Sequence, residues 1–102
     1  MEIKDFQKLI KAIYYKKDKK RGKEKTFMWF CEEVGELSRA LRRKRKKEMK
    51  EEFADVFAWL ISLANLYNID LEEAIKKYQK NCPKCKKSPC VCKEGLFLEK
   101  NK

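Results

Sequence analysis

Residues 32–55 of the chain read EEVGELSRALRRKRKKEMKEEFAD, and the rest of the sequence is organised around them. Apolar residues recur around this stretch at spacings of three and four, which is typical of helices that bury one face. We therefore expect one helix at about residues 27–43 and another at about 48–67. The basic run 42–50 between them is either a turn or an extension of the flanking helices. Acidic side chains stand at both ends of the stretch: Glu32, Glu33, Glu36, Glu52 and Asp55.

The two acidic clusters predict a metal site. Residues three and four apart share a helix face, so the carboxylates of each cluster can converge. Two antiparallel helices joined by a short turn would bring the clusters opposite each other. Carboxylates brought together repel, which raises their pKa values. A divalent cation relieves this repulsion, and Mg²⁺ is held by carboxylates together with substrate phosphates. The alternative is that these are solvent-facing acidic residues paired with nearby lysines and arginines.

The flanking segments complete an all-α bundle of about four helices. A first helix is expected at residues 3–15, followed by a charged loop at 16–25. Thr26 is then the N-cap of the next helix. Asp70 and Glu73 match a capping box that opens a fourth helix, which runs to the next proline.

Each of the two central helices is expected to bury one apolar stripe. The first stripe consists of Phe27, Phe30, Val34, Leu37 and Leu41. The second consists of Phe53, Val56, Phe57, Leu60, Ala64 and Tyr67. Trp59 and Leu66 lie on the carboxylate side of their helix, where they suit a base pocket or a subunit contact; a broad core face explains them equally well. Gly35 weakens its helix, which a close helix contact or a bound ligand could explain.

Composition restricts the class of protein. A chain of 102 residues with 43% apolar residues forms one domain with a modest core, so oligomerisation or a bound metal would help to stabilise it. Its net charge of +11 favours anionic partners. We expect a cytoplasmic protein without a membrane partner, because no apolar run could span a bilayer and the N-terminus lacks the core of a signal peptide. The absence of histidine excludes His-based catalysis, and no phosphate-binding P-loop is present.

The acidic pattern resembles the signature of a known family. Glu32-Glu33-x-x-Glu36 followed by Glu52-x-x-Asp55 is similar to the motif of the all-α nucleoside triphosphate pyrophosphohydrolases, the MazG-like superfamily. Residues 55–65 and 69–75 are also similar to the family's third helix and its turn into the fourth. The resemblance covers residues 1–81, and the chain departs from the family's usual ending after that point.

The resemblance implies a fold, an activity and a set of residues. It implies a helical bundle that works as a homodimer or homotetramer. The implied reaction converts a nucleoside triphosphate to its monophosphate and pyrophosphate. Housecleaning of nucleotide pools is the role that the resemblance suggests. Mg²⁺ would be bound by Glu33, Glu36, Glu52 and Asp55. Glu32 would be a further ligand or a base that orients water, so that the catalytic residues are Glu32, Glu33 and Glu36. Substrate contacts would come from Lys77, Asn81 and Asn65. Trp59 is a further candidate contact for the base, because of its place beside the acidic cluster rather than because of the resemblance.

The remaining residues, 82–102, form a cysteine-bearing tail, and the helical domain is expected to end at 81. Four thiolates suit a structural Zn²⁺ site, and the spacing fits a zinc knuckle. A redox pair or a disulfide staple are the alternatives. Cys31 lies apart and is expected to be a small buried hydrophobe. The proposed zinc ligands are Cys82, Cys85, Cys90 and Cys92.

A rival function comes from the basic charge. Residues 16–25 and 42–47, with a basic knuckle, could bind nucleic acid without catalysis. Neither run contains the interleaved aromatic residues of a stacking platform, and solvated lysine-rich segments explain them as well. An inactive family member kept for assembly is a third possibility. We favour the enzyme, because the carboxylates stand among the most apolar helices rather than in the lysine-rich stretches.

Overall fold

The computed structural model describes residues 1–93, and these residues form helices without any strand. The chain divides into two compact units, Met1–Glu72 and Glu73–Lys102. The predicted all-α class is confirmed. Within the described residues, no helix is both long and apolar enough to cross a membrane. The helices are α1 (Ile3–Arg21), α2 (Lys23–Arg43), α3 (Lys46–Leu66) and α4 (Leu71–Ala74), followed by a 3₁₀ segment, Ile75–Tyr78.

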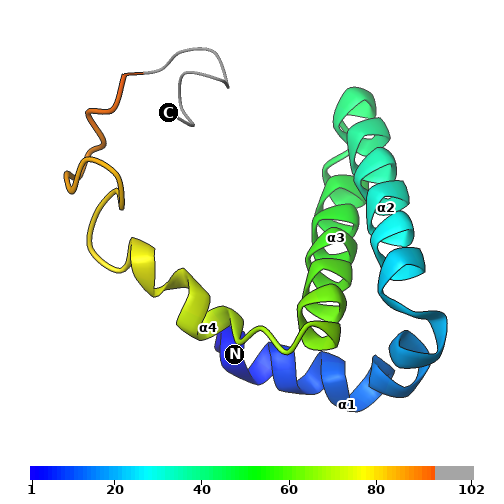
Figure 1. The fold of residues 1–102 in the computed structure, drawn as a ribbon. Coiled ribbons are helices and arrows are strands. Elements are labelled where there is room, and N and C mark those ends of the chain that lie inside the picture. Colours follow the sequence, from blue (N-terminus) through cyan, green and yellow to red (C-terminus); the bar gives the residue numbers. More distant parts are fainter. Residues whose placement is uncertain (94–102) are drawn as a thin grey trace. The chain divides into compact units, whose positions relative to one another are not determined.

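Helices α2 and α3 form an antiparallel hairpin (Figure 1). Most of the basic run 42–50 extends the two helices, and only Lys44 and Arg45 form the turn between them. Lys44 ends α2 in the left-handed conformation, with φ of 55°, and its N–H bonds to the carbonyls of Ala40 and Leu41. This geometry satisfies carbonyls that the helix end would otherwise leave unpaired. The short turn at Lys44 and Arg45 therefore sets the two acidic clusters on neighbouring helices.

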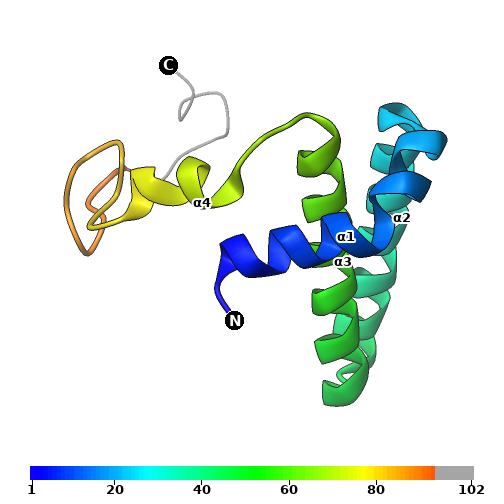
Figure 2. The same ribbon diagram turned by 90° about the horizontal axis from the view of Figure 1, so that it is seen from below.

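Helix α1 lies across this hairpin (Figures 1 and 2). Its Gln7 amide nitrogen donates to the Asn65 side-chain oxygen on α3 at 3.0 Å and to the Ile69 carbonyl at 2.8 Å. The Gln7 side-chain oxygen in turn accepts the Leu71 backbone N–H at 2.9 Å. One side chain of α1 thus fixes both the end of α3 and the turn that follows it. The buried apolar residues of this first unit are Ile10, Ala40, Ile61 and Leu66.

The prediction of a charged loop at residues 16–25 is wrong. Helix α1 continues to Arg21, and only Gly22, with φ of 92°, separates it from α2. The reason is a local ion pair: Asp18 is 2% exposed and its Oδ1 accepts from Arg21 at 2.9 Å, one turn later. Thr26 is likewise not an N-cap but lies fully buried inside α2, where its hydroxyl accepts from Arg21 at 3.2 Å.

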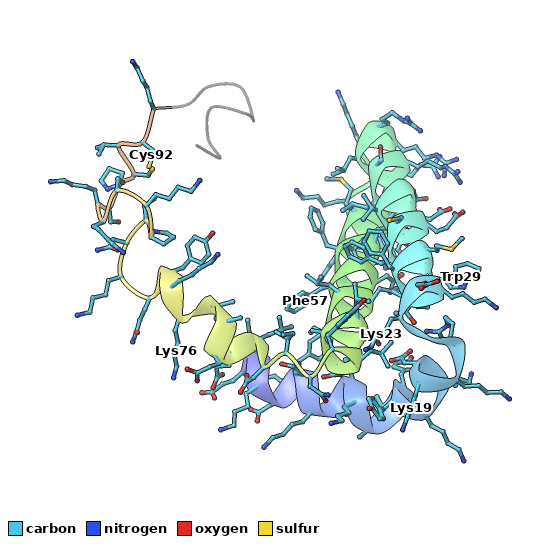
Figure 3. The ribbon with its side chains drawn as sticks, in the orientation of Figure 1. Lys19, Lys23, Trp29, Phe57, Lys76 and Cys92 are labelled. Atoms are coloured by element: carbon cyan, nitrogen blue, oxygen red, sulfur yellow. The ribbon has the colours of Figure 1, made fainter. Side chains whose placement is uncertain are left out.

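The predicted apolar stripes are only partly buried in the single chain. On α2, Phe27 is 51% exposed and Val34 and Leu41 are each 42% exposed. On α3, Phe53 and Tyr67 are more than half exposed. The prediction that one chain buries both stripes is therefore wrong: the buried apolar residues of these two helices are Ala40, Ile61 and Leu66, which lie outside the predicted stripes. Figure 3 shows Phe57 on α3 among the side chains of this unit.

The fourth helix is shorter than expected. Asp70 caps it as predicted, since its Oδ1 accepts the Glu72 backbone N–H at 3.0 Å. The α-helix ends at Ala74, and the chain continues as a 3₁₀ segment to Tyr78. Such segments are common at helix ends. The predicted domain boundary after residue 81 stays a prediction.

Candidate functional site

Three of the five predicted carboxylates meet between α2 and α3. One oxygen each from Glu33, Glu52 and Asp55 lies within 4.8 Å of the others. Glu33 and Glu52 are half-buried, whereas Asp55 is exposed. Glu33 comes from α2 and the other two come from α3, one turn apart. The hairpin thus creates this cluster, and no single helix could.

The cluster is electrostatically strained. Burial, followed by the neighbouring charges of Asp55, Glu36 and Glu32, raises the pKa of Glu33 above its ordinary value. Burial also raises the pKa of Glu52, with further contributions from the charges of Glu33, Asp55 and Glu36 and from a hydrogen bond to Asp55. Each shift means that the negative form is disfavoured in the folded state. A cation among these oxygens would reverse that effect.

Glu36 and Glu32 lie outside the tight group. Glu36 is close enough to raise both pKa values, but its own carboxylate pairs with Arg39 at 3.6 Å. Glu32 is exposed and lines a hollow on α2 with Phe27 and Gly35. A Cβ added to Gly35 would meet nothing within 4 Å. A close helix contact, one of the two explanations offered for Gly35, is therefore absent within the described part of this chain, and a bound ligand stays a hypothesis.

A cleft of about 310 Å³ opens beside Asp55. Trp59 lines this cleft, and the Arg21 guanidinium stacks over its ring at 4.8 Å from the ring centroid. Trp29 of α2, labelled in Figure 3, stacks with Trp59 at a centroid distance of 6.4 Å. A carboxylate of the acidic cluster, an aromatic ring and a fixed cation thus share one opening. Its lining residues are Tyr14, Lys17, Asp18, Arg21, Asp55, Ala58, Trp59 and Ser62.

Sequence reasoning missed Asp18 and Arg21. Both fell in the stretch interpreted as a loop, although the i, i+3 spacing of opposite charges was a signal for a helical pair. The Asp18 Oδ2 atom is buried without a hydrogen-bond partner, so Arg21 carries the whole compensation of that charge. Arg21 is held by Asp18 and Thr26 while it covers Trp59.

The predicted substrate contacts fall in different places. Trp59 lies at the cleft. Asn65 is 5% exposed and bonded to Gln7, ten residues after Asp55, which is about 15 Å along a helix. It lines a separate hollow of about 360 Å³ with Lys4 and Lys8. Lys77 and Asn81 belong to the second unit, and their contact with substrate stays a prediction.

The second unit brings its four cysteines together. One sulfur each from Cys82, Cys85, Cys90 and Cys92 lies within 4.8 Å of the others. The Val91 N–H, followed by the Lys87 N–H, lowers the pKa of Cys85 to about 6, although burial opposes the shift. Neighbouring cysteines, Cys90 first, raise the pKa of Cys92 to about 12. The four sulfurs could therefore all be thiolates together only if a cation compensated their charge.

Cys31 does not join that group. It is exposed, so the prediction of a small buried hydrophobe is wrong. It lies on α2 beside Phe27, Met28 and Glu32, on a face that the described residues leave open.

Comparison with known proteins places this geometry in a family. The pattern of the MazG nucleotide pyrophosphohydrolase domain matches residues 21–86, which include every predicted carboxylate and the first two clustered cysteines. The chain is also 29% identical over 101 residues to Uncharacterized protein YvdC of Bacillus subtilis strain 168, and this match covers 82% of the chain and 95% of the relative. With the acidic cluster on its helical hairpin and this match over most of its length, the chain belongs to the MazG nucleotide pyrophosphohydrolase domain family.

Proposed function

We propose that this protein is a Mg²⁺-dependent pyrophosphohydrolase that converts a nucleoside triphosphate to its monophosphate and pyrophosphate. The observation that carries the proposal is the group of Glu33, Glu52 and Asp55, whose oxygens lie within 4.8 Å of one another beside the Trp59 cleft. The same location serves phosphate chemistry and nucleoside binding at once. Removal of unwanted nucleotides in the cytoplasm is the role we favour.

The donor set fits Mg²⁺. Its atoms are carboxylate oxygens, which hard divalent cations prefer. The raised pKa values of Glu33 and Glu52 reflect repulsion that a cation would relieve. We assign Glu33, Glu52 and Asp55 as ligands and Glu36 as a fourth, which would exchange its pairing with Arg39 for the ion. Bound Mg²⁺ neutralises phosphate charge and lowers the pKa of a bound water.

The side chains around the cluster then divide the remaining work. Water adds across the bond between the α- and β-phosphates, which gives the monophosphate and pyrophosphate and releases one proton. Glu32 is exposed near Glu33 and is our candidate to orient that water and accept the proton. Trp59 and the Arg21 guanidinium that lies over its ring are our candidates to contact the base and the rest of the nucleotide. Lys77 and Asn81 are candidates for phosphate and sugar contacts.

We further propose that the working form is a homodimer or homotetramer. The partly exposed stripes of α2 and α3 support a second copy as the partner, since large apolar residues at helical spacing are left unpartnered in the described part of one chain. Leu60→Arg places a charge in the α3 stripe, whereas Ser38→Arg places it at an exposed polar position of α2. We expect the first to lower the molar mass measured by light scattering and the second to leave it unchanged. An unchanged mass for both would contradict the proposed interface.

The activity is tested by a pyrophosphate-release screen with Mg²⁺ over canonical and damaged nucleotides. Asp55→Asn is expected to lower kcat/KM by roughly 10³-fold, about 4 kcal/mol of transition-state stabilisation. Glu51→Gln, an exposed neighbour outside the cluster, is the matched control and is expected to retain activity. Far-UV circular dichroism checks that both variants fold. The absence of pyrophosphate release from every nucleotide would overturn the proposal.

Nucleic-acid binding is the rival that the net charge of +11 favours. It requires salt-sensitive binding to DNA or RNA that survives Asp55→Asn and weakens when lysines in 42–50 are replaced. Such binding without pyrophosphate release would favour the rival function.

A further inference from the structure

Two sulfur–sulfur distances in the cysteine cluster match those of a tetrahedral metal site. A Zn–S bond of about 2.3 Å places the sulfurs of an ideal tetrahedron about 3.8 Å apart. The sulfurs of Cys82 and Cys92 lie 3.8 Å apart, and so do those of Cys85 and Cys90. Disulfide sulfurs would lie at about 2.0 Å. The distances therefore correspond to ligands around an ion rather than to two covalent bridges.

The backbone around the sulfurs is arranged for thiolates. The Val91 N–H donates to the Cys85 sulfur at 3.5 Å, and the Cys92 N–H donates to the Cys90 sulfur at 3.3 Å. The loop from Cys82 is closed by two backbone bonds: the Lys86 N–H donates to the Cys82 carbonyl at 2.8 Å, and the Cys82 N–H donates to the Lys87 carbonyl. Partners of this kind orient the ligands of a metal.

This segment has no apolar core of its own. None of residues 73–93 is buried, whereas every buried residue of the described chain lies between Ile10 and Leu66. A segment of this size cannot recover its ordering entropy from apolar burial alone. A structural Zn²⁺ ion supplies folding free energy directly.

The local charge also suits a tetrathiolate ion. Four thiolates with one Zn²⁺ carry a net charge of about −2. Residues 73–93 contain seven lysines and one acidic residue, so the segment is strongly basic without the metal. Figure 3 labels Cys92 and Lys76 in this segment.

We propose that Cys82, Cys85, Cys90 and Cys92 bind one Zn²⁺ ion, and that this ion holds residues 73–93 in their fold. The proposal is independent of the pyrophosphohydrolase activity. Iron on the same four thiolates and two disulfides are the competing outcomes, and the experiment separates them.

The test starts with the full chain purified under reducing conditions. Metal analysis is expected to find one zinc per chain, and reconstitution with Co²⁺ is expected to give the intense visible absorption of a tetrahedral thiolate site. Cys85→Ser and Cys92→Ser are expected to remove the stoichiometric zinc and to weaken the cobalt signal. Cys31→Ser is the matched control, because Cys31 is exposed and outside the cluster, and it is expected to retain one zinc.

Three results would overturn the proposal. Stoichiometric iron would replace zinc as the ion. The second result is a protein without zinc whose intact mass is lower by two hydrogens for each bridge. If such a protein comes from a reducing cell extract and is prepared without added reductant, its cysteines form disulfides. Full zinc retention in both cysteine variants would place the ion elsewhere. Because the cobalt spectrum is measured on the unmodified chain, the test holds even if a variant folds poorly.

Discussion

The carboxylate cluster and the cysteine cluster bring their ligand atoms within the same 4.8 Å, but the chain supports them in opposite ways. The carboxylates stand on long helices whose packing includes the buried Ile61, and they repel one another. The sulfurs stand in a segment without buried residues, and backbone N–H groups turn toward them. We expect the first to be a strained site on a helical fold that does not depend on a metal ion. In the second, the proposed ion is part of the fold.

The largest expected effect comes from removing the proposed zinc. Structural Zn²⁺ contributes about 10 kcal/mol or more in small zinc-binding peptides. A strong chelator is therefore expected to abolish hydrogen-exchange protection in residues 73–93 and to leave α2 and α3 protected, as measured by mass spectrometry of peptic fragments. Equal loss of protection in both segments would contradict the proposed difference between them, because the helical unit would then also depend on the metal.

A smaller effect is expected from Arg21→Ala. This change leaves the buried carboxylate of Asp18 without its ion-pair partner, which costs about 3 kcal/mol. Arg43→Ala is the control, since Arg43 is 53% exposed and lies 4.0 Å from Glu48, and surface pairs of this kind contribute less than about 1 kcal/mol. Urea unfolding measures both values. Equal losses would show that the Asp18 pair does not stabilise the helical unit.

Removing one charge from the carboxylate cluster is expected to raise the stability of the folded protein, whereas Arg21→Ala lowers it. Glu33→Gln removes one of the repelling charges, so the metal-free protein should gain about 1 kcal/mol of stability while its pyrophosphohydrolase activity falls. Glu51→Gln should change neither by a comparable amount. A loss of stability in Glu33→Gln without metal would contradict the assignment of strain to this cluster.

The same strain predicts a pH dependence. The folded-state pKa values of Glu33 and Glu52 lie above their ordinary value of 4.5, so the folded protein binds these protons more tightly than the unfolded chain. The ionised carboxylates therefore lower the stability of the folded protein by the full amount at pH values above their folded-state pKa. This loss of stability disappears as the pH falls below the pKa of the unfolded chain. In thermal unfolding without metal, Glu33→Gln should therefore gain less relative to the unmodified protein at pH 4 than at pH 7. A gain independent of pH would contradict this origin.

A gain of similar size is expected at Gly35. A Cβ there meets nothing in this chain, so Gly35→Ala should stabilise α2 by about 1 kcal/mol. Thermal unfolding at low protein concentration measures this gain. If the same variant no longer forms the oligomer, a second copy of the chain approaches α2 at this residue. Gly35 would then be needed for assembly but not for the fold of the single chain.

Local pattern was sufficient for the fold class and for the residue types that gather in the two clusters. Helical periodicity predicted α2 and α3, and the spacing of Glu33 from Glu52 and Asp55 predicted a cluster on the hairpin. It was insufficient at residues 16–25, where composition suggested solvent and a buried ion pair extends α1 instead. Composition cannot distinguish a charge that faces water from one that finds a partner a turn away.

Periodicity and side-chain chemistry are local properties, and they were enough to predict a helical protein with one acidic site and with last cysteines spaced for a metal. That Glu33, Glu52 and Asp55 meet while Glu36 pairs with Arg39 could be seen in the folded chain alone. The tertiary structure alone placed Arg21 over Trp59 in a cleft beside Asp55. These contacts depend on how each helix is rotated about its axis and where α1 crosses the hairpin, and packing between distant residues fixes both.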